Sequence, residues 1–322
     1  MLTKSEAIAL LNQLGKEEIP FSFYCDFLGN QWSIKSDIDS NKSKTFLLSI
    51  NEKATIDVSN PSFTKAPINF TTYRKRFDRV IEEINRGNSF LTNLTFETPI
   101  QTNLSLEEIF HAAQAKYRLI VDDQFVVFSP ETFVKMENGF IHSYPMKGTI
   151  DADLPNARDL ILADIKEKAE HVTIVDLIRN DLSQIATEVH VTKFRYIDEI
   201  KTNEKHLLQV SSEIQGKLPH DWKQQIGTIL TALLPAGSIS GAPKPETLRI
   251  IQENEQYERG FYTGICGQFD GKSLDSGVMI RFIKKENDQL FYCSGGGITS
   301  FSEVEKEYKE MVDKVYLPFL QA

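Results

Sequence analysis

The chain has few cysteines and no long apolar stretch. Its three cysteines, Cys25, Cys266 and Cys293, are widely separated within 322 residues. Three scattered thiols make neither a disulfide framework nor a four-ligand zinc site, so we expect reduced thiols in a cytoplasmic protein. No apolar run approaches the roughly 18 residues of a membrane-spanning helix, and the N-terminus lacks the apolar region of a signal peptide. We therefore expect no membrane partner.

The chain also lacks an excess of positive charge. It has 36 Lys and Arg residues against 45 Asp and Glu residues, a formal net charge of −9. A nucleic-acid-binding protein normally presents a basic face, so we expect no nucleic-acid partner. Neither the Gly-x-x-x-x-Gly-Lys-Ser/Thr nor the Gly-x-Gly-x-x-Gly nucleotide-binding motif occurs. A hydrophobic content of 41% and a charged content of 25% are typical of a globular protein.

Helical and strand-like patterns occur in blocks. Helical periodicity covers Phe70 to Asn85 and Asp164 to Ile185, and a further helix is predicted from about Ser302. Strand-like stretches lie between these helices, and Glu137-Asn138-Gly139 is typical of a hairpin turn. Because strands and helices do not alternate regularly, we predict an α+β fold with antiparallel sheets.

Two pairs of glutamates are spaced three residues apart. Glu167 and Glu170 lie on the predicted long helix, and Glu307 and Glu310 lie on the C-terminal one. Residues at i and i+3 share a helix face, so each helix can present two carboxylates to one point. An oxygen-rich site of this kind suits Mg²⁺, which prefers a few carboxylates and keeps several waters. The alternative is that these are ordinary solvated glutamates.

Two glycine-rich segments could approach a ligand with their backbones. Gly295-Gly296-Gly297 follows a strand-like stretch, and Gly241-Ala242 lies in a loop that opens a helix. Glycines without side chains let backbone N–H groups form a concavity for an anion, and helix N-termini attract carboxylates. Plain turns are the alternative for each segment.

Lys147 is flanked by Pro145 and Gly148, and Glu131 precedes it in Ser129-Pro130-Glu131. An amine in a fixed backbone, with a carboxylic acid near it in the fold, can serve as nucleophile and proton donor in one reaction. A surface lysine in a turn is the alternative, because proline and glycine are common in turns.

Many motifs in one order resemble those of the chorismate-binding enzymes, which include anthranilate, aminodeoxychorismate, isochorismate and salicylate synthases. The resemblance covers roughly residues 70–318 and implies two packed, largely antiparallel sheets with helices on the outside. It also implies a chorismate-binding catalytic region at 70–322 and a shortened N-terminal part at 1–69, in one structural unit. The motifs are Ser129-Pro130-Glu131, Pro145 to Thr149, Ala169-Glu170-His171, Ile174 to Leu182, His206-Leu207, Gly241 to Lys244, Arg259 to Gly264, Ile280-Arg281, Gly295 to Ile298 and Glu307-Tyr308.

Within this family the chain is most similar to aminodeoxychorismate synthase component I. That branch carries lysine in Pro-Ile-Lys-Gly-Thr, where the other branches usually carry alanine, and this chain has Lys147 in Pro-Met-Lys-Gly-Thr. Members that add water use a lysine as base at the position of Leu91. A leucine side chain cannot activate water, so water addition is disfavoured here. Members that add an amine usually have glutamine there, so Leu91 departs from both patterns.

The resemblance implies a role for each site residue. Glu131 protonates the departing C4 hydroxyl of chorismate, Lys147 attacks C2 to form a covalent intermediate, and His206 lies near the ring. Mg²⁺ is held by Glu170 and Glu310, with two further glutamates acting through waters. The remaining residues bind substrate carboxylates or supply backbone donors. The implied metal-site and substrate-binding residues are Glu167, Glu170, Glu307 and Glu310, and Tyr262, Arg281, Lys314, Gly241, Ala242, Gly295, Gly296 and Gly297.

The implied reaction converts chorismate and ammonia to 4-amino-4-deoxychorismate, for p-aminobenzoate and folate synthesis. No cysteine lies in a nucleophile-elbow sequence, so we expect ammonia from solution or from a separate glutamine amidotransferase subunit. An aminodeoxychorismate lyase would act on the product. Two alternatives stay open: an anthranilate synthase component I, and a non-catalytic chorismate-binding subunit.

Overall fold

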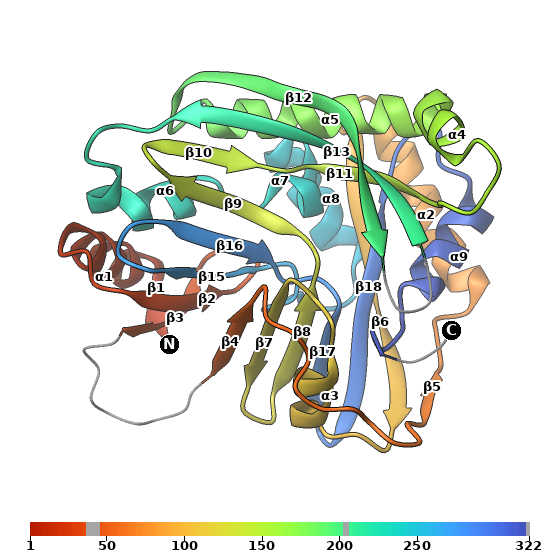
Figure 1. Cartoon of the computed structure of the whole chain (residues 1–322). Helices are drawn as coiled ribbons and strands as arrows, with labels where there is room; N and C mark the ends of the chain where they lie inside the picture. The colour runs from red at the N-terminus through yellow and green to blue at the C-terminus, as the bar shows by residue number, and fades with distance from the viewer. Residues whose placement is uncertain (37–45, 202–205, 320–322) are drawn as a thin grey trace.

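Two β-sheets pack against one another and carry helices on their outer sides (Figure 1). The computed structural model describes residues 1–36, 46–201 and 206–319. Every strand pairing in these ranges is antiparallel, which confirms the predicted α+β fold class.

The first sheet, called sheet A, contains both the N-terminal strands and the long hairpin near the middle of the chain. In spatial order it comprises β1 (Leu2–Thr3), β3 (Gln31–Ser36), β2 (Phe21–Cys25), β15 (Ile265–Phe269), β16 (Leu274–Val278), β9 (Thr132–Glu137), β10 (Phe140–Ser143), β13 (His206–Lys217) and β11 (Met146–Asp151), with β12 (Thr187–Lys201) also paired to β13.

The second sheet, sheet B, is built around the long strands β6 and β18. In spatial order it comprises β14 (Gly241–Ala242), β6 (Leu91–Thr102), β18 (Gln289–Ile298), β17 (Phe282–Glu286), β8 (Phe125–Ser129), β7 (Tyr117–Val121) and β4 (Leu47–Ile50), with β5 (Phe63–Lys65) also paired to β6.

Several local predictions match the structure closely. The turn between β9 and β10 consists of Asn138 and Gly139, both with positive φ (53° and 80°), as a two-residue hairpin requires. Helix α2 spans Phe70–Asn85, the predicted range, and α5 spans Ile165–Leu182 within the predicted one. Helix α9 spans Val304–Asp313 and so begins two residues later than predicted.

The described part of residues 1–69 contributes to both sheets: β1, β2 and β3 belong to sheet A, and β4 and β5 belong to sheet B. Strand β2 lies between β3 and β15, and Phe23 pairs with Gly267 in that ladder. Helix α1 (Lys4–Lys16) and α6 (Ile226–Ala232) pack on this sheet together with α5, which contributes Ile178 to the same apolar cluster. Burial of these apolar faces fixes α5, and with it the glutamates near its N-terminal end, against the sheet.

Helices α2, α8 (Lys244–Asn254) and α9 cover β6 and β18 of sheet B, while the short α3 (Leu106–Ala112) packs on β7 and β8. Three more short helices complete the described chain: α4 (Ala157–Ala163), α7 (Gly237–Ser240) and the 3₁₀ helix η1 (Trp222–Gln225). None of the helices in the described ranges has the length and apolar character needed to cross a membrane.

Two of the segments that cross between the sheets lie next to one another. One crossing joins β8 to β9 and contains Glu131, and the other joins β16 to β17 and contains Arg281. Each crossing segment is hydrogen-bonded to a strand at the end of the other crossing. Val278 N of β16 donates to Glu131 O (3.1 Å), and Phe128 N of β8 donates to Arg281 O (3.1 Å). Two side chains that are distant in the sequence are therefore held at one junction of the sheets.

Candidate active site

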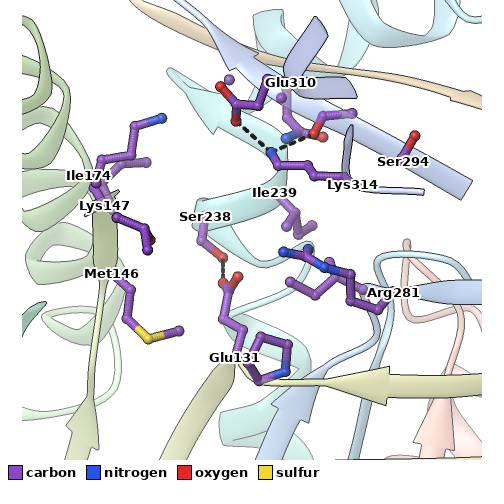
Figure 2. Close-up of a pocket in the computed structure, with 18 of the residues that line it drawn as sticks. Glu131, Met146, Lys147, Ile174, Ser238, Ile239, Arg281, Ser294, Glu310 and Lys314 are labelled. Atoms are coloured by element: carbon purple, nitrogen blue, oxygen red, sulfur yellow. Dashed lines mark hydrogen bonds and ion pairs between the residues drawn. The ribbon is translucent and has the colours of Figure 1, made fainter. Parts of the chain in front are cut away.

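A cavity of about 510 Å³ lies at the junction of the two sheets. Its volume is typical of a site for a small molecule. Figure 2 shows Lys147 on one side, Glu310 and Lys314 on another, and Arg281 facing them, with Glu131 beside Ser238. The sequence-predicted residues that line the cavity are Glu131, Lys147, Glu167, Tyr262, Arg281, Gly295, Gly296, Gly297, Glu310 and Lys314.

Lys147 enters the cavity from β11. Its Nζ lies 2.6 Å from Glu170 Oε2, in an ion pair whose carboxylate is buried. Burial alone would lower the pKa of Lys147, but the charges of the neighbouring glutamates outweigh burial and hold the pKa above its usual value. The glutamates that raise it are Glu170, Glu167 and Glu310. The amine is therefore protonated in this arrangement, and it must lose a proton before it can act as a nucleophile.

One glutamate of each pair lines the cavity, Glu167 from α5 and Glu310 from α9, whereas Glu170 and Glu307 are buried and are not among the described residues that line it. Glu167 Oε2 lies beside Gly148, which has φ of 84°, and a methyl group at Gly148 would approach that oxygen to 3.2 Å. On the other side, a methyl group at Gly296 would lie 3.5 Å from Glu307 Oε2 and 3.8 Å from Glu310 Oε1. The absence of side chains at these glycines leaves space between the carboxylates.

The carboxylates fit a divalent cation that needs only a few protein ligands. Within the described ranges, no three acidic, histidine or cysteine side chains form a ready-made metal cage. Mg²⁺ needs only one or two carboxylates and retains waters. Glu167 Oε2 is buried and has no hydrogen-bond donor among the described residues, which favours a cation beside it. Burial raises the pKa of Glu167, Lys147 lowers it, and Glu170 raises it, with a net increase that a bound cation would reverse.

Glu131 is the acidic group on the opposite side of the cavity. Ser238 Oγ, from α7, donates a hydrogen bond to Glu131 Oε1 at 2.5 Å. Burial raises the pKa of Glu131 above its usual value, and the serine hydroxyl only partly offsets this effect. A buried carboxyl with a raised pKa can hold a proton and deliver it to a leaving group.

Replacing Ser238 by alanine should raise the pKa of Glu131 further, because the hydroxyl stabilises the charged carboxylate. The protonated carboxyl has a distinct infrared carbonyl band, which Glu131→Gln would identify by removing it. We expect this band to persist to higher pH in Ser238→Ala than in the wild type. Ser238→Thr keeps a hydroxyl and serves as the control. A band that disappears at the same or lower pH in the alanine variant would contradict the interpretation.

Basic and phenolic groups line the remaining wall. Arg281 has a positive φ of 54°, and its buried Nε has no acceptor among the described residues. Lys314 caps the C-terminal end of α9 and donates to Gly295 O at 2.8 Å, with Glu310 Oε1 at 2.7 Å. Buried Tyr262 completes this wall. An arginine nitrogen without an acceptor, next to a lysine, favours a ligand that carries carboxylates.

The glycine stretch differs from its prediction. Gly295, Gly296 and Gly297 do not form a loop but continue β18, paired with Thr95, Leu94 and Asn93 of β6. The ladder with β6 occupies one edge of these glycines, and the pairing of β18 with β17 ends at Cys293, so donation of a backbone N–H to an anion stays a prediction. Their contribution is the absence of side chains: a methyl group at Gly295 would lie 2.3 Å from Leu94 O. The three glycines form a part of the cavity wall from which no side chain projects.

Two other predicted positions lie away from the cavity. Gly241 and Ala242 form the short strand β14, paired with Thr92 and Leu91, and neither is among the described residues that line the cavity. Gly241 is required there because its φ is 132° and a methyl group would lie 1.9 Å from Leu91 O. The prediction that this segment binds substrate is therefore not supported by the structure.

His206 is not brought to the cavity either. It begins β13, is partly exposed, and lies 3.6 Å from Glu199 and 3.8 Å from Asp153 through its ring nitrogens. The described residues that line the cavity do not include it. A general acid or base must come within hydrogen-bond reach of the reacting atoms, so the predicted catalytic role of His206 has no geometric support.

Sequence reasoning missed several polar residues of the cavity, among them Ser238 and Asn93. Ser238 contacts Glu131 across a separation of 107 residues, and no local pattern indicates this contact. Asn93 lies two residues after Leu91 on β6, and both side chains line the cavity. The two-residue period of a strand was a usable signal for Asn93, because alternate residues face the same side.

Comparison with known proteins agrees with this geometry. A protein family described as chorismate binding enzyme matches residues 12–319. The chain is 49% identical, over 98% of its length and 97% of the relative's, to an uncharacterized PabA-like protein of Haemophilus influenzae. It is 31% identical to aminodeoxychorismate synthase component 1 of Bacillus subtilis, over 78% of this chain and 55% of that protein. A solved structure of anthranilate synthase component I from Streptococcus pneumoniae superposes with a TM-score of 0.66, 28% identity and coverage of 81% of this chain and 60% of the other.

Proposed function

The chain belongs to the chorismate-binding enzyme family, and from that premise we propose that it is an aminodeoxychorismate synthase component I. The observation that carries this proposal is the presence of Lys147 and Glu131 in one cavity. Binding of chorismate alone needs neither a nucleophile nor an acid with a raised pKa. The similarity to the Bacillus subtilis aminodeoxychorismate synthase component 1 supports the same assignment.

The first step is displacement of the C4 hydroxyl. The neutral amine of Lys147 attacks C2 of chorismate, the ring double bonds shift, and the C4–O bond breaks. Glu131 gives its proton to the departing oxygen, so water leaves and the Glu131 carboxylate is left charged. Arg281, Lys314 and Tyr262 hold the two substrate carboxylates, which keeps C2 facing the lysine. The product of this step is a lysine-linked intermediate.

In the second step ammonia attacks C4 and Lys147 leaves C2 as a neutral amine, which restores the ring double bonds. The new ammonium group at C4 returns one proton to Glu131, so the acid is ready for another cycle. The overall change is chorismate plus ammonia to 4-amino-4-deoxychorismate plus water. Two displacements with modest barriers replace one direct substitution, which is the usual advantage of covalent catalysis.

The glutamates of α5 and α9 would hold the metal ion in this proposal. Glu170 and Glu310 would be its direct ligands, and Glu167 and Glu307 would act through waters. When bound, Mg²⁺ supplies positive charge that orients and polarises the ring carboxylate. Because Glu170 pairs with Lys147 in the structure, the lysine must move away from that oxygen when Glu170 binds a cation.

Ammonia comes from outside the chain in this proposal. A glutaminase of the nucleophile-elbow type needs an accessible, reactive thiol. Cys25, Cys266 and Cys293 are all buried, and burial raises the pKa of Cys266 to about 12. None of the three suits that chemistry, so we propose a separate glutamine amidotransferase or free ammonia as the source, and an aminodeoxychorismate lyase as the enzyme that acts next.

A product assay tests the proposal. The purified chain is incubated with chorismate, Mg²⁺ and ammonium chloride, with and without added aminodeoxychorismate lyase, and products are separated by chromatography. We expect p-aminobenzoate only when both ammonium and the lyase are present. Omitting ammonium is the matched control.

Two other outcomes would replace the proposal. Anthranilate formed without the lyase would assign the chain to ortho amination, as in the anthranilate synthases to which it is also similar. Binding of chorismate with no turnover under any condition would indicate a non-catalytic chorismate-binding subunit.

A further inference from the structure

Asn93 is a cavity residue whose side-chain oxygen has no donor. It lies on β6 two residues after Leu91, and the side chains of both line the cavity. Asn93 Oδ1 is buried and receives no hydrogen bond from the described residues. Because native proteins seldom leave a buried polar atom unpaired, this oxygen points to a ligand group that donates a hydrogen bond.

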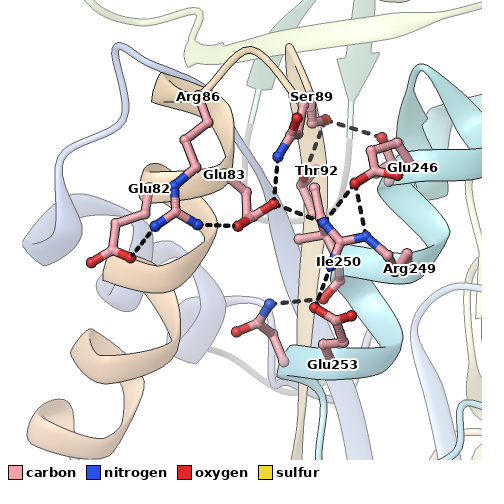
Figure 3. Close-up of polar contacts among 12 residues, drawn as sticks. Glu82, Glu83, Arg86, Ser89, Thr92, Glu246, Arg249, Ile250 and Glu253 are labelled. Carbon is pink, nitrogen blue, oxygen red and sulfur yellow. Dashed lines mark hydrogen bonds and ion pairs between the residues drawn. The ribbon is translucent and has the colours of Figure 1, made fainter.

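The strand that carries Asn93 is held firmly in place. Arg259 Nη2 donates to Asn93 O at 2.8 Å, and Arg259 is itself buried in an ion pair with Glu255. Just before β6, Ser89 Oγ donates to Leu91 O at 2.9 Å. The neighbouring Arg249 binds acidic residues of both α2 and α8 (Figure 3), so these helices support the same strand. Because these contacts fix the backbone of β6, the Asn93 side chain is held in one orientation.

The space beside Asn93 is small. Gly297 is its partner across the β6–β18 ladder, and opposite residues of a ladder project to the same side. Gly297 adds no side chain, while Leu91 closes the neighbouring space: a methyl group at Gly297 would lie 2.9 Å from Leu91 Cδ1. The recess therefore offers one amide oxygen, an apolar neighbour and room for a small donor.

We propose that Asn93 Oδ1 accepts a hydrogen bond from ammonia and orients it for attack, an inference that rests on the amination proposed above. A neutral amide oxygen accepts an N–H bond and leaves the ammonia lone pair free to attack. A carboxylate at this position would instead stabilise ammonium, whose lone pair is protonated. Leu91 supplies no polar contact, so Asn93 is the positioning residue on this strand face.

Steady-state kinetics with the full-length chain test this role. Asn93→Ala and Asn93→Leu should raise the KM for ammonia about tenfold, the effect of one lost hydrogen bond of about 1.4 kcal/mol. The KM for chorismate should not change. Formation of the Lys147 adduct without ammonia should also be unchanged, which a general structural defect would not allow. In Leu91→Gln/Asn93→Ala the amide moves to the adjacent position on the same face, and we expect most of the loss to be recovered.

The outcomes are distinguishable. An unchanged KM for ammonia in Asn93→Ala, or equal increases in the KM values of ammonia and chorismate, would overturn the inference while the amination reaction stands. A chain that forms no aminated product even as the wild type would overturn the proposed function and this inference with it. A selective increase for ammonia, with recovery in the double variant, supports both.

Discussion

Replacing Lys147 by alanine should abolish the covalent intermediate and slow amination about 10³-fold, the scale expected when a nucleophile is removed, or about 4 kcal/mol of barrier. The physical reason is that C2 then has no amine within the cavity to displace the C4 hydroxyl. Mass spectrometry of the wild type with chorismate and Mg²⁺, without ammonia, should show a mass gain of chorismate minus one water on the peptide containing Lys147. The variant should show none.

Lys147→Arg is the matched control, because it separates nucleophilicity from charge. Arginine can keep an ion pair with Glu170, but it does not lose its proton at accessible pH and cannot attack. Both variants should therefore lose the adduct, while only alanine leaves the buried Glu170 carboxylate without its cation. Any residual product of Lys147→Ala should carry nitrogen at C2, where ammonia takes the place of the missing amine. Wild-type rates in either variant would contradict a covalent mechanism.

Replacing Glu131 by glutamine should lower the rate of adduct formation about 10²- to 10⁴-fold, the usual effect of removing a general acid. Glutamine keeps the size of the side chain and an oxygen that can accept the bond from Ser238, but it has no proton to release. Single-turnover measurement of adduct formation isolates this step.

The affinity for chorismate provides the control for Glu131→Gln. A protonated glutamate and a glutamine are both neutral, so calorimetric titration with chorismate should give nearly the same dissociation constant for both proteins. Glu131→Asp retains a proton but withdraws it from the cavity, and an intermediate rate is expected. Adduct formation at the wild-type rate in Glu131→Gln would show that another group protonates the leaving hydroxyl.

The sequence predicts the parts of the fold that depend on local patterns. Helix α2 coincides with its predicted range because an amphipathic period begins at Phe70 and ends near Gly87. The β9–β10 turn follows from Asn138-Gly139, since both residues tolerate positive φ. The i, i+3 spacing of the two glutamate pairs correctly placed them on helices α5 and α9, and one member of each pair, Glu167 and Glu310, is among the described residues that line the cavity.

Contacts between distant segments were not predictable in the same way. A run of glycines is compatible with a turn or a strand, and only the pairing with β6 decides that Gly295 to Gly297 continue β18. Arg281 lies in the crossing between β16 and β17, where it has a positive φ and lines the cavity, and the local sequence does not indicate this backbone conformation. The bond between Ser238 and Glu131 depends on two separate crossings of the chain and has no local signal.

The position of nitrogen in the product tests the account most directly. The chain is supplied with chorismate, Mg²⁺ and ¹⁵N-labelled ammonium, and the product is examined by NMR before any lyase is added. The account predicts ¹⁵N bonded to C4, with the enolpyruvyl ether retained at C3, and no such product from Lys147→Ala. Nitrogen bonded to C2 in the wild-type product, or no incorporation of nitrogen, would contradict it.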